Sequence, residues 1–335
     1  MTAAAACRPQ GLLEEDFMAV SEPSSAKLTP LRHVVAAQQF DRERLSQLFQ
    51  LSTEMEQLRE SGGAQLLPGR ILATLFYEPS TRTRLSFEAA MLRLGGQVIS
   101  TENARDFSSA IKGETLEDTV RIVAGYSDCI VLRHSEEGAA ARAAEISPVP
   151  IINAGDGPGQ HPTQALLDLF TIQVELGRLD DLHVVMVGDL SHGRTVHSLA
   201  YLLALYSGLR VTLVAPDSIR MSAGVVEHLL KHGVVVRETE NLLEAVADAD
   251  VVYQTRIQVE RFSEPWEESE DNRRHFRITE AVMDRLPQGA IVMHPLPRVG
   301  EIDPAIDQDS RAAYFRQARN GVSVRMALMK TLLAA

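Results

Sequence analysis

The sequence predicts an α/β protein made of two doubly wound domains, each built around a parallel sheet. Short apolar runs of strand length alternate with helical patterns along nearly the whole chain, and this alternation is typical of parallel sheets covered by helices. A length of 335 residues is enough for two domains of ordinary size. A glycine-rich stretch from Gly155 to Gly159 interrupts the alternation near its middle, which makes it the expected domain junction.

The first half of the chain contains the elements expected of one domain. A helix is predicted from Asp41 to about Arg59, because apolar residues recur on one side of it: Leu45, Leu48, Phe49 and Leu51. Further elements follow from apolar runs and helical periodicity. They are a strand at 71–77, helices at 80–94 and 114–125, a strand at 129–132, a helix at 137–145 and a buried strand at 149–153.

The second half repeats the strand and helix rhythm. It opens with a long segment at 163–176 that is predicted to be an amphipathic helix. Strands are expected at 183–187, 210–214, 234–238, 250–254 and 290–293, with helices between them. Polar, charged sequence at 260–274 predicts a long surface loop, of a length that is often functional. A last helix is predicted at 321–333.

Composition excludes several classes of protein. The net charge of −12 argues against a general nucleic-acid binder, which usually carries a basic face. No apolar run approaches the roughly 20 residues of a membrane helix. The two cysteines, Cys7 and Cys129, make neither a disulfide framework nor a zinc pattern, and this usage fits a reducing cytosol. Residues 1–30 lack the apolar core of a signal peptide and are expected to be a flexible extension.

Cofactor motifs are also missing from the sequence. The ten histidines show no metal-binding spacing such as H-E-x-x-H. Gly155–Gly159 contains a proline and lacks the full G-x-G-x-x-G pattern of a dinucleotide site. No G-x-S-x-G elbow occurs. The expected cofactor content is therefore none, and no metal is expected.

The strongest chemical signal is the run F-Y-E-P-S-T-R-T-R, from Phe76 to Arg84, at a predicted turn from strand to helix. Free amides of a first helical turn attract anions, and the hydroxyls of Ser80, Thr81 and Thr83 add further donors. Arg82 can form two parallel hydrogen bonds with a phosphate. The run therefore predicts an anion site.

An ordinary capped helix with two surface arginines is the alternative interpretation of this run. A lone Ser-Thr pair at a helix start is usually only a cap, but hydroxyls interleaved with two arginines after a buried strand are much less common. The anion site is therefore favoured. Arg84, which lies further into the helix, is expected to form a structural ion pair with Glu78 or Glu88.

The second signal is H-P-T-Q, in which His161 and Gln164 are spaced to lie on the same side of a helix's first turn. Both side chains suit the polarisation of a carbonyl oxygen. Arg133, at the end of the strand 129–132, is a possible third donor, because ligands gather at the carboxyl ends of parallel strands. A structural histidine near the helix start is the alternative, and it would be preferred if His161 stood alone.

The third signal is a pair of arginines in the second half. Arg194 follows the strand 183–187 and Arg256 follows the strand 250–254. Arginines beyond the carboxyl ends of strands can grip two carboxylates. Surface salt bridging is the alternative, and the sequence alone leaves the two interpretations about equal.

Two loops complete the candidate site. The segment H-P-L-P-R, from His294 to Arg298, follows a strand, and its prolines are expected to hold backbone carbonyls in a rigid array that can accept hydrogen bonds from an amine. The polar stretch from Ser108 to Glu114 contains Lys112, which by sequence alone reads as a solvated lysine.

In this order, F-Y-E-P-S-T-R-T-R, H-P-T-Q, Y-Q-T-R-I-Q and H-P-L-P-R resemble the aspartate/ornithine carbamoyltransferase family, over roughly Leu31 to the end of the chain. H-P-L-P-R and T-R-x-Q, with Lys112 in K-G-E, are similar to the aspartate branch. The ornithine branch typically has a cysteine in place of the first proline, and neither cysteine of this chain is near that position.

The resemblance implies an activity and a role for each motif. The reaction would be carbamoyl transfer from carbamoyl phosphate to the amino group of L-aspartate, in pyrimidine biosynthesis, without a cofactor. The phosphate would be bound by Ser80, Thr81, Arg82 and Thr83. The carbamoyl carbonyl would be polarised by Arg133, His161 and Thr83, with its amide held by Gln164. The aspartate would be bound by Arg194, Arg256 and Gln258 at its carboxylates and by Leu296, with Pro297, at its amine.

The resemblance also implies an assembly and a division of the chain. The loop with Ser108 and Lys112 would reach the active site of a neighbouring subunit, so the protein would be a homotrimer with shared sites. Carbamoyl phosphate would bind to a domain at 31–160 plus the last helix, 321–335, which returns to it. Aspartate would bind to a domain at 161–320, joined to the first by interdomain helices.

Two other functions remain open from the sequence. The acceptor could be ornithine or an acetylated derivative, although two arginines suit a dicarboxylate better than a cationic side chain. A silent subunit that scaffolds a pyrimidine-synthesis complex is an alternative from another class, which the intact set of site residues disfavours. A regulatory or dihydroorotase-like partner chain is possible, and no nucleic acid or membrane is expected.

Overall fold

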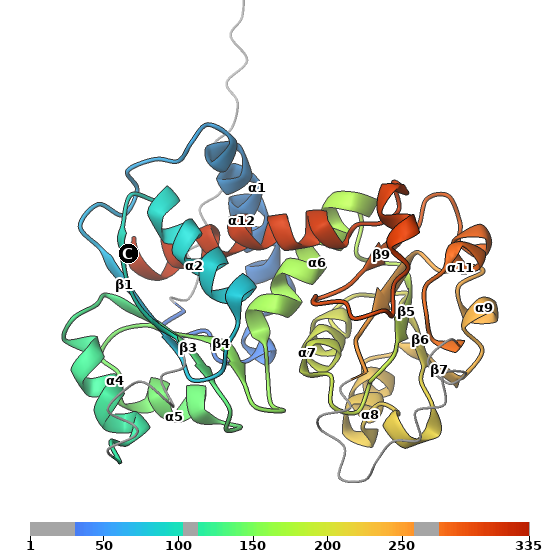
Figure 1. The fold of residues 1–335 in the computed structure, drawn as a ribbon, viewed down its shortest axis with the longest axis horizontal. Helices are drawn as coiled ribbons and strands as arrows, with labels where there is room; N and C mark the ends of the chain where they lie inside the picture. The colour runs from blue at the N-terminus through green and yellow to red at the C-terminus, as the bar shows by residue number, and fades with distance from the viewer. Residues whose placement is uncertain (1–30, 103–112, 258–274, 335) are drawn as a thin grey trace, which may run out of the picture.

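The computed structural model describes residues 31–102, 113–257 and 275–334. Two fully parallel sheets form its centre, one with strand order β2-β1-β3-β4 and the other with order β7-β6-β5-β8-β9. They lie in separate halves of the molecule with helices on and between them (Figure 1). The predicted class of two doubly wound α/β units is confirmed.

The first sheet and its helices come from the first half of the chain. In chain order the elements are η1 (Ala37–Gln39), α1 (Arg42–Glu60), β1 (Ile71–Phe76), α2 (Thr81–Arg93), β2 (Gln97–Glu102), α4 (Leu116–Ala124), β3 (Cys129–His134), α5 (Ala139–Ile146) and β4 (Ile151–Asp156). Local signals explain several of the helix starts. The Asp41 side chain accepts a hydrogen bond from the Arg44 amide at 2.8 Å and caps α1. Thr115 caps α4 in the same way, at 3.1 Å from the Asp118 amide.

The second sheet follows in sequence. Its unit comprises α6 (Pro162–Leu176), β5 (His183–Val187), α7 (Arg194–Leu203), β6 (Arg210–Val214), η3 (Asp217–Ile219), α8 (Ala223–Lys231), β7 (Val235–Thr239), α9 (Leu242–Ala245), β8 (Val251–Gln254), α11 (Glu280–Arg285), β9 (Ile291–Met293), η5 (Pro304–Gln308) and α12 (Tyr314–Leu333). The predicted strands of this half are all present within a residue of their expected bounds. The loop expected at 260–274 lies outside the described residues.

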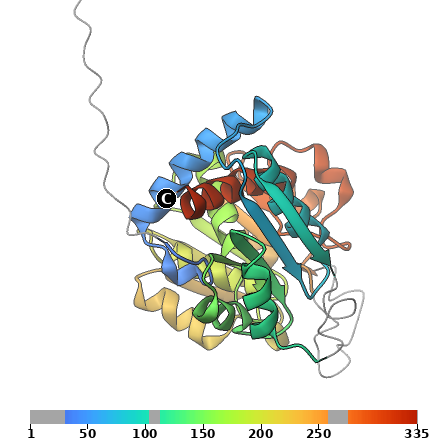
Figure 2. The same cartoon turned by 90° about the vertical axis from the view of Figure 1, so that its left-hand side faces the viewer.

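Two long helices, α6 and α12, join the halves. The α12 helix starts beside β9, crosses α6 and ends beside α1 and α2, with α1 and α12 side by side in both views (Figures 1 and 2). Buried residues of all these helices form one continuous apolar core, exemplified by Leu45, Phe87, Phe170 and Leu328. The last helix therefore returns to the first half, as the resemblance implied.

Five elements differ from their prediction, one of them β4, which spans Ile151–Asp156 where 149–153 was expected. β2 was missed because its sequence, Q-V-I-S-T-E, is largely polar at a half-exposed sheet edge. β3 continues through His134, so Arg133 lies within the strand and not after it. The α6 helix is not amphipathic over most of its length, since its first eleven residues are all buried between the halves. α12 begins at Tyr314, seven residues earlier than expected, in a polar stretch without a clear apolar stripe.

The order of the strands indicates where a ligand would bind. In the first sheet the chain moves from β1 outward to β2 and then back to β3 on the other side, and the second sheet reverses in the same way between β5 and β8. Ligands of open parallel sheets bind beyond the carboxyl ends of the strands at such reversals. The motifs at Ser80, Arg133, Arg194 and Arg256 all lie at these strand ends.

Two further findings concern composition. Within the described ranges, no helix combines the length and apolar character needed to cross a bilayer. Cys129 is a free, fully buried thiol on β3, and burial raises its pKa well above the usual range. Its thiol is therefore a packing group of the core and not a reactive one.

Candidate active site

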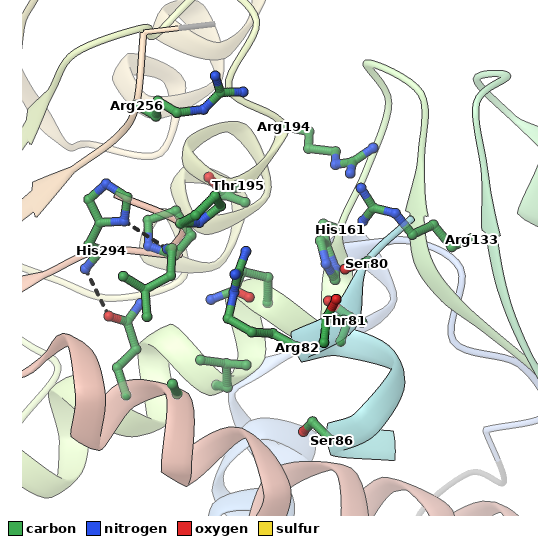
Figure 3. A pocket seen from close by; sticks show the side chains of 18 of the residues that line it. Ser80, Thr81, Arg82, Ser86, Arg133, His161, Arg194, Thr195, Arg256 and His294 are labelled. Carbon is green, nitrogen blue, oxygen red and sulfur yellow. Dashed lines mark hydrogen bonds between the residues drawn. The ribbon is translucent and has the colours of Figure 1, made fainter. Parts of the chain in front are cut away.

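A cavity of about 600 Å³ opens between the two halves, at the carboxyl ends of β1, β3, β5 and β8. Its lining includes every described residue that the sequence analysis assigned to the site: Ser80, Thr81, Arg82, Thr83, Arg133, His161, Gln164, Arg194, Arg256, Leu296 and Pro297. Figure 3 shows several of these side chains together, among them Arg82 and Arg133 of the first half and Arg194 of the second. Ser108, Lys112 and Gln258 lie outside the described residues.

The start of α2 forms one wall of the cavity. Ser80 is the residue before the helix, and its hydroxyl makes no capping hydrogen bond, so it is available to a ligand. Thr81 and Arg82 are exposed, and the Arg82 side chain extends from the helix into the cavity (Figure 3). The first-turn amides, these hydroxyls and a guanidinium group together make a strong anion site.

Arg84 points away from this wall. Its guanidinium lies 2.8 Å from the carboxylate of Glu102 and 3.5 Å from that of Glu88. The expected structural ion pair with Glu88 is confirmed, and the alternative partner, Glu78, was wrong. Glu102 was missed because it lies on β2, the strand that the sequence pattern did not reveal.

Two arginines, Arg133 on β3 and Arg194 at the start of α7, meet over Gly155. Arg133 donates to the Ala154 carbonyl at 3.2 Å, and Arg194 donates to the Gly157 carbonyl at 2.6 Å. A Cβ atom on Gly155 would lie 2.9 Å from the Arg194 Cζ and 3.1 Å from the Arg133 Nη1, and its φ is +112°. Only glycine fits here, on both steric and backbone grounds. This stretch therefore seats two guanidinium groups at the cavity wall.

Glu78 is the acidic residue of this wall. Its carboxylate lies 3.3 Å from the Arg133 guanidinium and 3.9 Å from that of Arg194. From the sequence, Glu78 was expected only as a possible partner for Arg84. Its actual role is to bridge arginines of the first and second halves, which local sequence does not reveal.

His161 lies at the base of the same wall and is only 4% exposed. Its Nδ1 atom is buried and has no hydrogen-bond partner in the described structure. Burial lowers the pKa of His161 well below its ordinary value, and the neighbouring charges of Arg194, Arg133 and Arg325 lower it further. The imidazole is therefore neutral near pH 7, which suits hydrogen bonding to a polarised carbonyl and not proton uptake.

Arg325 on α12 is a cavity residue that the sequence analysis missed. It is 3% exposed, donates to the Ser86 hydroxyl at 2.6 Å, and lies over the Phe87 ring at 4.8 Å. Burial lowers the pKa of Arg325 to about 10, so it remains charged at neutral pH. Its signal in the sequence is an arginine within the apolar run V-S-V-R-M-A-L, which is unusual unless the charge has a purpose.

The loop after β9 forms the opposite wall. The Leu296 amide donates to the His294 Nδ1 at 2.7 Å, and the His294 amide donates to the Gln317 side chain at 2.8 Å. The His294 Nε2 lies 2.7 Å from the carboxylate of Glu301. Leu296 has a φ of +57°, a left-handed conformation that is uncommon outside glycine. These hydrogen bonds hold the loop, and the predicted role of its prolines in presenting carbonyls stays a prediction.

Arg256 completes the cavity beyond β8. It follows Thr255, whose amide and hydroxyl both bond to the Val187 carbonyl at the end of β5. This contact fixes the backbone next to Arg256. Across the described parts of the chain, no group of His, Cys, Asp and Glu side chains is arranged to hold a metal ion. The cavity combines several cations, the carboxylate of Glu78 and neutral hydrogen-bonding groups.

Comparison with known proteins gives consistent relationships. Two family models match the chain: aspartate/ornithine carbamoyltransferase, carbamoyl-P binding domain, at residues 32–174, and aspartate/ornithine carbamoyltransferase, Asp/Orn binding domain, at residues 180–332. A chloroplastic aspartate carbamoyltransferase of Oryza sativa subsp. japonica is 56% identical, over 90% of this chain and 85% of that protein. An aspartate carbamoyltransferase catalytic subunit of Methanothrix thermoacetophila is 50% identical, over 90% of this chain and 98% of its own length.

Solved structures agree with these relationships. The catalytic subunit of M. jannaschii aspartate transcarbamoylase superposes with a TM-score of 0.84 at 46% identity, covering 91% of this chain and 98% of that one. Aspartate transcarbamoylase from Trypanosoma cruzi, in complex with N-(phosphonacetyl)-L-aspartic acid, superposes with a TM-score of 0.86 at 42% identity and the same coverage.

Proposed function

Since the chain belongs to the aspartate/ornithine carbamoyltransferase family, we propose that it transfers the carbamoyl group of carbamoyl phosphate to the amino group of L-aspartate. The products are N-carbamoyl-L-aspartate and phosphate, in the pathway of pyrimidine biosynthesis. The observation that carries this function is the single cavity in which the helix-start anion site of the first half faces Arg194 and Arg256 of the second. It offers a place for a phosphate beside a place for a dicarboxylate.

The phosphate end is assigned to the start of α2. The hydroxyls of Ser80, Thr81 and Thr83, the amides of the first turn and the Arg82 guanidinium supply donors for the phosphate oxygens. A charged donor strengthens each such bond, and a guanidinium can supply two in parallel. Binding here leaves the carbamoyl carbon directed toward the second half.

The carbamoyl group is assigned to the wall of Arg133, His161 and Gln164. Attack by the uncharged amine of aspartate forms a bond to the carbamoyl carbon, and negative charge develops on the carbonyl oxygen. Arg133, His161 and Thr83 donate to that oxygen, an effect worth about 3–4 kcal/mol for each well-placed donor. The carbon–oxygen bond to phosphate then breaks, and the departing phosphate takes the proton of the amine.

Aspartate is assigned to the second half. Arg194 and Arg256 face its carboxylates, and the Leu296 carbonyl, held by the Pro297 loop, accepts from its amine. Gln258 is assigned to the same carboxylates. Both substrates are anions, so much of the rate comes from holding them together against their repulsion. The guanidinium groups of Arg82, Arg133 and Arg194 offset that repulsion.

We expect purified protein to turn over carbamoyl phosphate with aspartate and not with ornithine, because Arg194 and Arg256 repel a cationic side chain. The measurement is steady-state product formation with each acceptor in parallel. Turnover with ornithine would mean that the arginines of the second half are wrongly assigned. A folded protein that produces nothing with either acceptor would favour the silent-subunit alternative.

We also propose a homotrimer whose active sites are shared between subunits. The support is the family resemblance of the segment with Ser108 and Lys112, which implies that these residues act in a neighbouring subunit's site. Carbamoyl phosphate binding is assigned to 31–160 with 321–335, and aspartate binding to 161–320. Among the described residues of one subunit, the cavity is lined by arginines and by no lysine. The proposed Lys112 would therefore be added to it by the neighbouring subunit.

Mixing two inactive variants tests the sharing. Arg82→Ala and Lys112→Ala subunits, dissociated together and reassembled, are expected to regain activity, since about a quarter of the sites in random trimers combine an intact Arg82 with an intact Lys112. Each variant reassembled alone is the control and stays inactive. If the activity of the mixture does not exceed that of either variant reassembled alone, both residues act within one subunit.

We propose that the protein works in the cytosol, on the basis of its cysteine usage. The rice relative is named chloroplastic, so a plastid is the alternative, and microscopy of the full chain fused to a fluorescent protein separates the two. A regulatory or dihydroorotase-like partner chain stays a prediction, for which copurification with the full chain is the test.

A further inference from the structure

Asp168 is a fully buried acid on α6 that does not line the cavity. Side chains from three segments nevertheless donate hydrogen bonds to its carboxylate. Gln164 and Gln317 both donate through their Nε2 atoms to Oδ1, at 2.8 and 2.6 Å, and the Tyr253 hydroxyl donates to Oδ2 at 2.6 Å. Since buried charge is costly, an acid with this many specific donors is expected to have a function.

Each donor connects Asp168 to a different wall of the cavity. Gln164 lines the cavity one turn earlier on α6. The other end of the Gln317 amide accepts from the His294 amide at 2.8 Å, which anchors the loop 294–297. The Tyr253 hydroxyl is close enough to the side chain of Thr195, another cavity residue, for Thr195 to oppose the rise in the pKa of Tyr253. The carboxylate is therefore a common support for the joining helix α6 and for two walls of the second half.

The chemistry of a carboxylate dictates how the two glutamines are turned. An ionised carboxylate accepts hydrogen bonds and cannot donate them. Gln164 must therefore present its NH₂ group to Asp168, which leaves its Oε1 as the end available to the cavity. Gln317 is constrained in the same way, and its Oε1 is indeed the atom that accepts from His294.

We propose that Asp168 is a positioning residue of the reaction, which sets the direction of the Gln164 amide and holds the loop 294–297 through Gln317. The inference rests on the proposed function, in which Gln164 binds the carbamoyl amide. With Oε1 in the cavity, Gln164 accepts from the NH₂ of the carbamoyl group. With its amide reversed, two NH₂ groups would face each other and the contact would be lost.

The orientation of Gln164 and Gln317 depends on the negative charge of Asp168. Burial raises the pKa of this carboxyl to about 7, while the hydrogen bonds from Tyr253, Gln317 and Gln164 and the charge of Arg325 oppose the rise. The titratable groups that face it are Tyr253 on β8 and Arg325 on α12. Protonation turns an acceptor into a donor, so the Gln164 orientation is lost as pH falls through about 7, and kcat is expected to fall with it.

Asp168→Asn is the test, because asparagine has the same shape but can present a donor to Gln164. The matched control is Thr171→Val, one turn further along α6, where the Thr171 hydroxyl accepts from Asn320 on α12 at 3.1 Å. Both variants alter a buried hydrogen bond between α6 and α12. Only Asp168→Asn also changes the contact that orients Gln164 in the cavity wall. Asp168→Asn is expected to lower kcat about 100-fold and to abolish the acid limb of the pH profile. Thr171→Val is expected to keep both kcat and the limb.

Equal kcat values for the two variants, or an unchanged acid limb in Asp168→Asn, would overturn the proposal. If Asp168→Asn does not fold, Tyr253→Phe replaces it. Loss of the Tyr253 donor destabilises the ionised form of Asp168 and raises its pKa, so the acid limb of the pH profile is expected to move to higher pH. An acid limb that stays in place would count against the role of Asp168.

Failure of the proposed function gives a different pattern. In that case wild type and Thr171→Val would both be inactive with aspartate. Calorimetric titration with carbamoyl phosphate would still test Asp168, since Asp168→Asn is expected to bind it about tenfold more weakly than Thr171→Val. Equal binding by the two variants would overturn the positioning role independently of turnover.

Discussion

Arg82→Ala is expected to lower kcat/KM for carbamoyl phosphate at least about 1000-fold, because it removes a charged, bidentate donor for the phosphate. Arg82 is exposed to the cavity and forms no ion pair with any other described residue, so the variant is expected to fold normally. Stopped assays over a range of carbamoyl phosphate concentrations measure the loss, and circular dichroism measures the fold.

Arg84→Ala is the matched control for this variant. It removes the same kind of side chain two residues further along α2, from ion pairs with Glu88 and Glu102 outside the cavity. We expect it to lose about 1 kcal/mol of stability and to remain active. Near-normal activity of a folded Arg82→Ala variant, or equal losses in the two variants, would refute the assignment of the phosphate site.

Arg133→Ala is expected to lower kcat about 100- to 1000-fold with a much smaller change in KM, because its donor acts on charge that develops in the transition state. Its removal relieves repulsion with Arg194 across Gly155, and Glu78 keeps Arg194 as a partner, so we expect the fold to persist. Steady-state kinetics with both substrates varied separates kcat from KM.

Arg133→Lys is the informative companion. Lysine keeps the charge but lacks the planar, directed donors of a guanidinium group, so its kcat is expected to lie between those of wild type and Arg133→Ala. A rise in KM with an unchanged kcat in either variant would place Arg133 in ground-state binding and not in stabilisation of the transition state.

Most of the fold and much of the candidate site could be predicted from local sequence patterns. The strands β5 and β6 begin and end where predicted, because short apolar runs are bounded there by polar residues. The motif residues could be placed at the ends of strands, and parallel sheets bring such ends together. Arg133 was placed near the cavity on this reasoning, even though its strand is longer than expected.

The parts that could not be predicted depend on contacts between distant segments. Gln317 and Arg325 reach the cavity only because α12 crosses α6, and no periodicity in the last residues of the chain indicates that crossing. Asp168 stands as one acid among apolar neighbours, in L-L-D-L-F, and its donors lie up to 149 residues away. Such a position is conspicuous in the sequence, but its partners are visible only in the fold.

The two guanidinium groups packed against Gly155 have a consequence for the lifetime of the protein. Like charges held close together raise the free energy of the native state, and the Glu78 carboxylate, 3.3 Å from the Arg133 guanidinium and 3.9 Å from that of Arg194, opposes this effect. A substrate that binds the folded protein at this wall stabilises it, by about 2.7 kcal/mol at 100 times its dissociation constant. The protein is therefore expected to unfold less often with its substrates bound than without them, which would make its resistance to proteolysis depend on substrate supply.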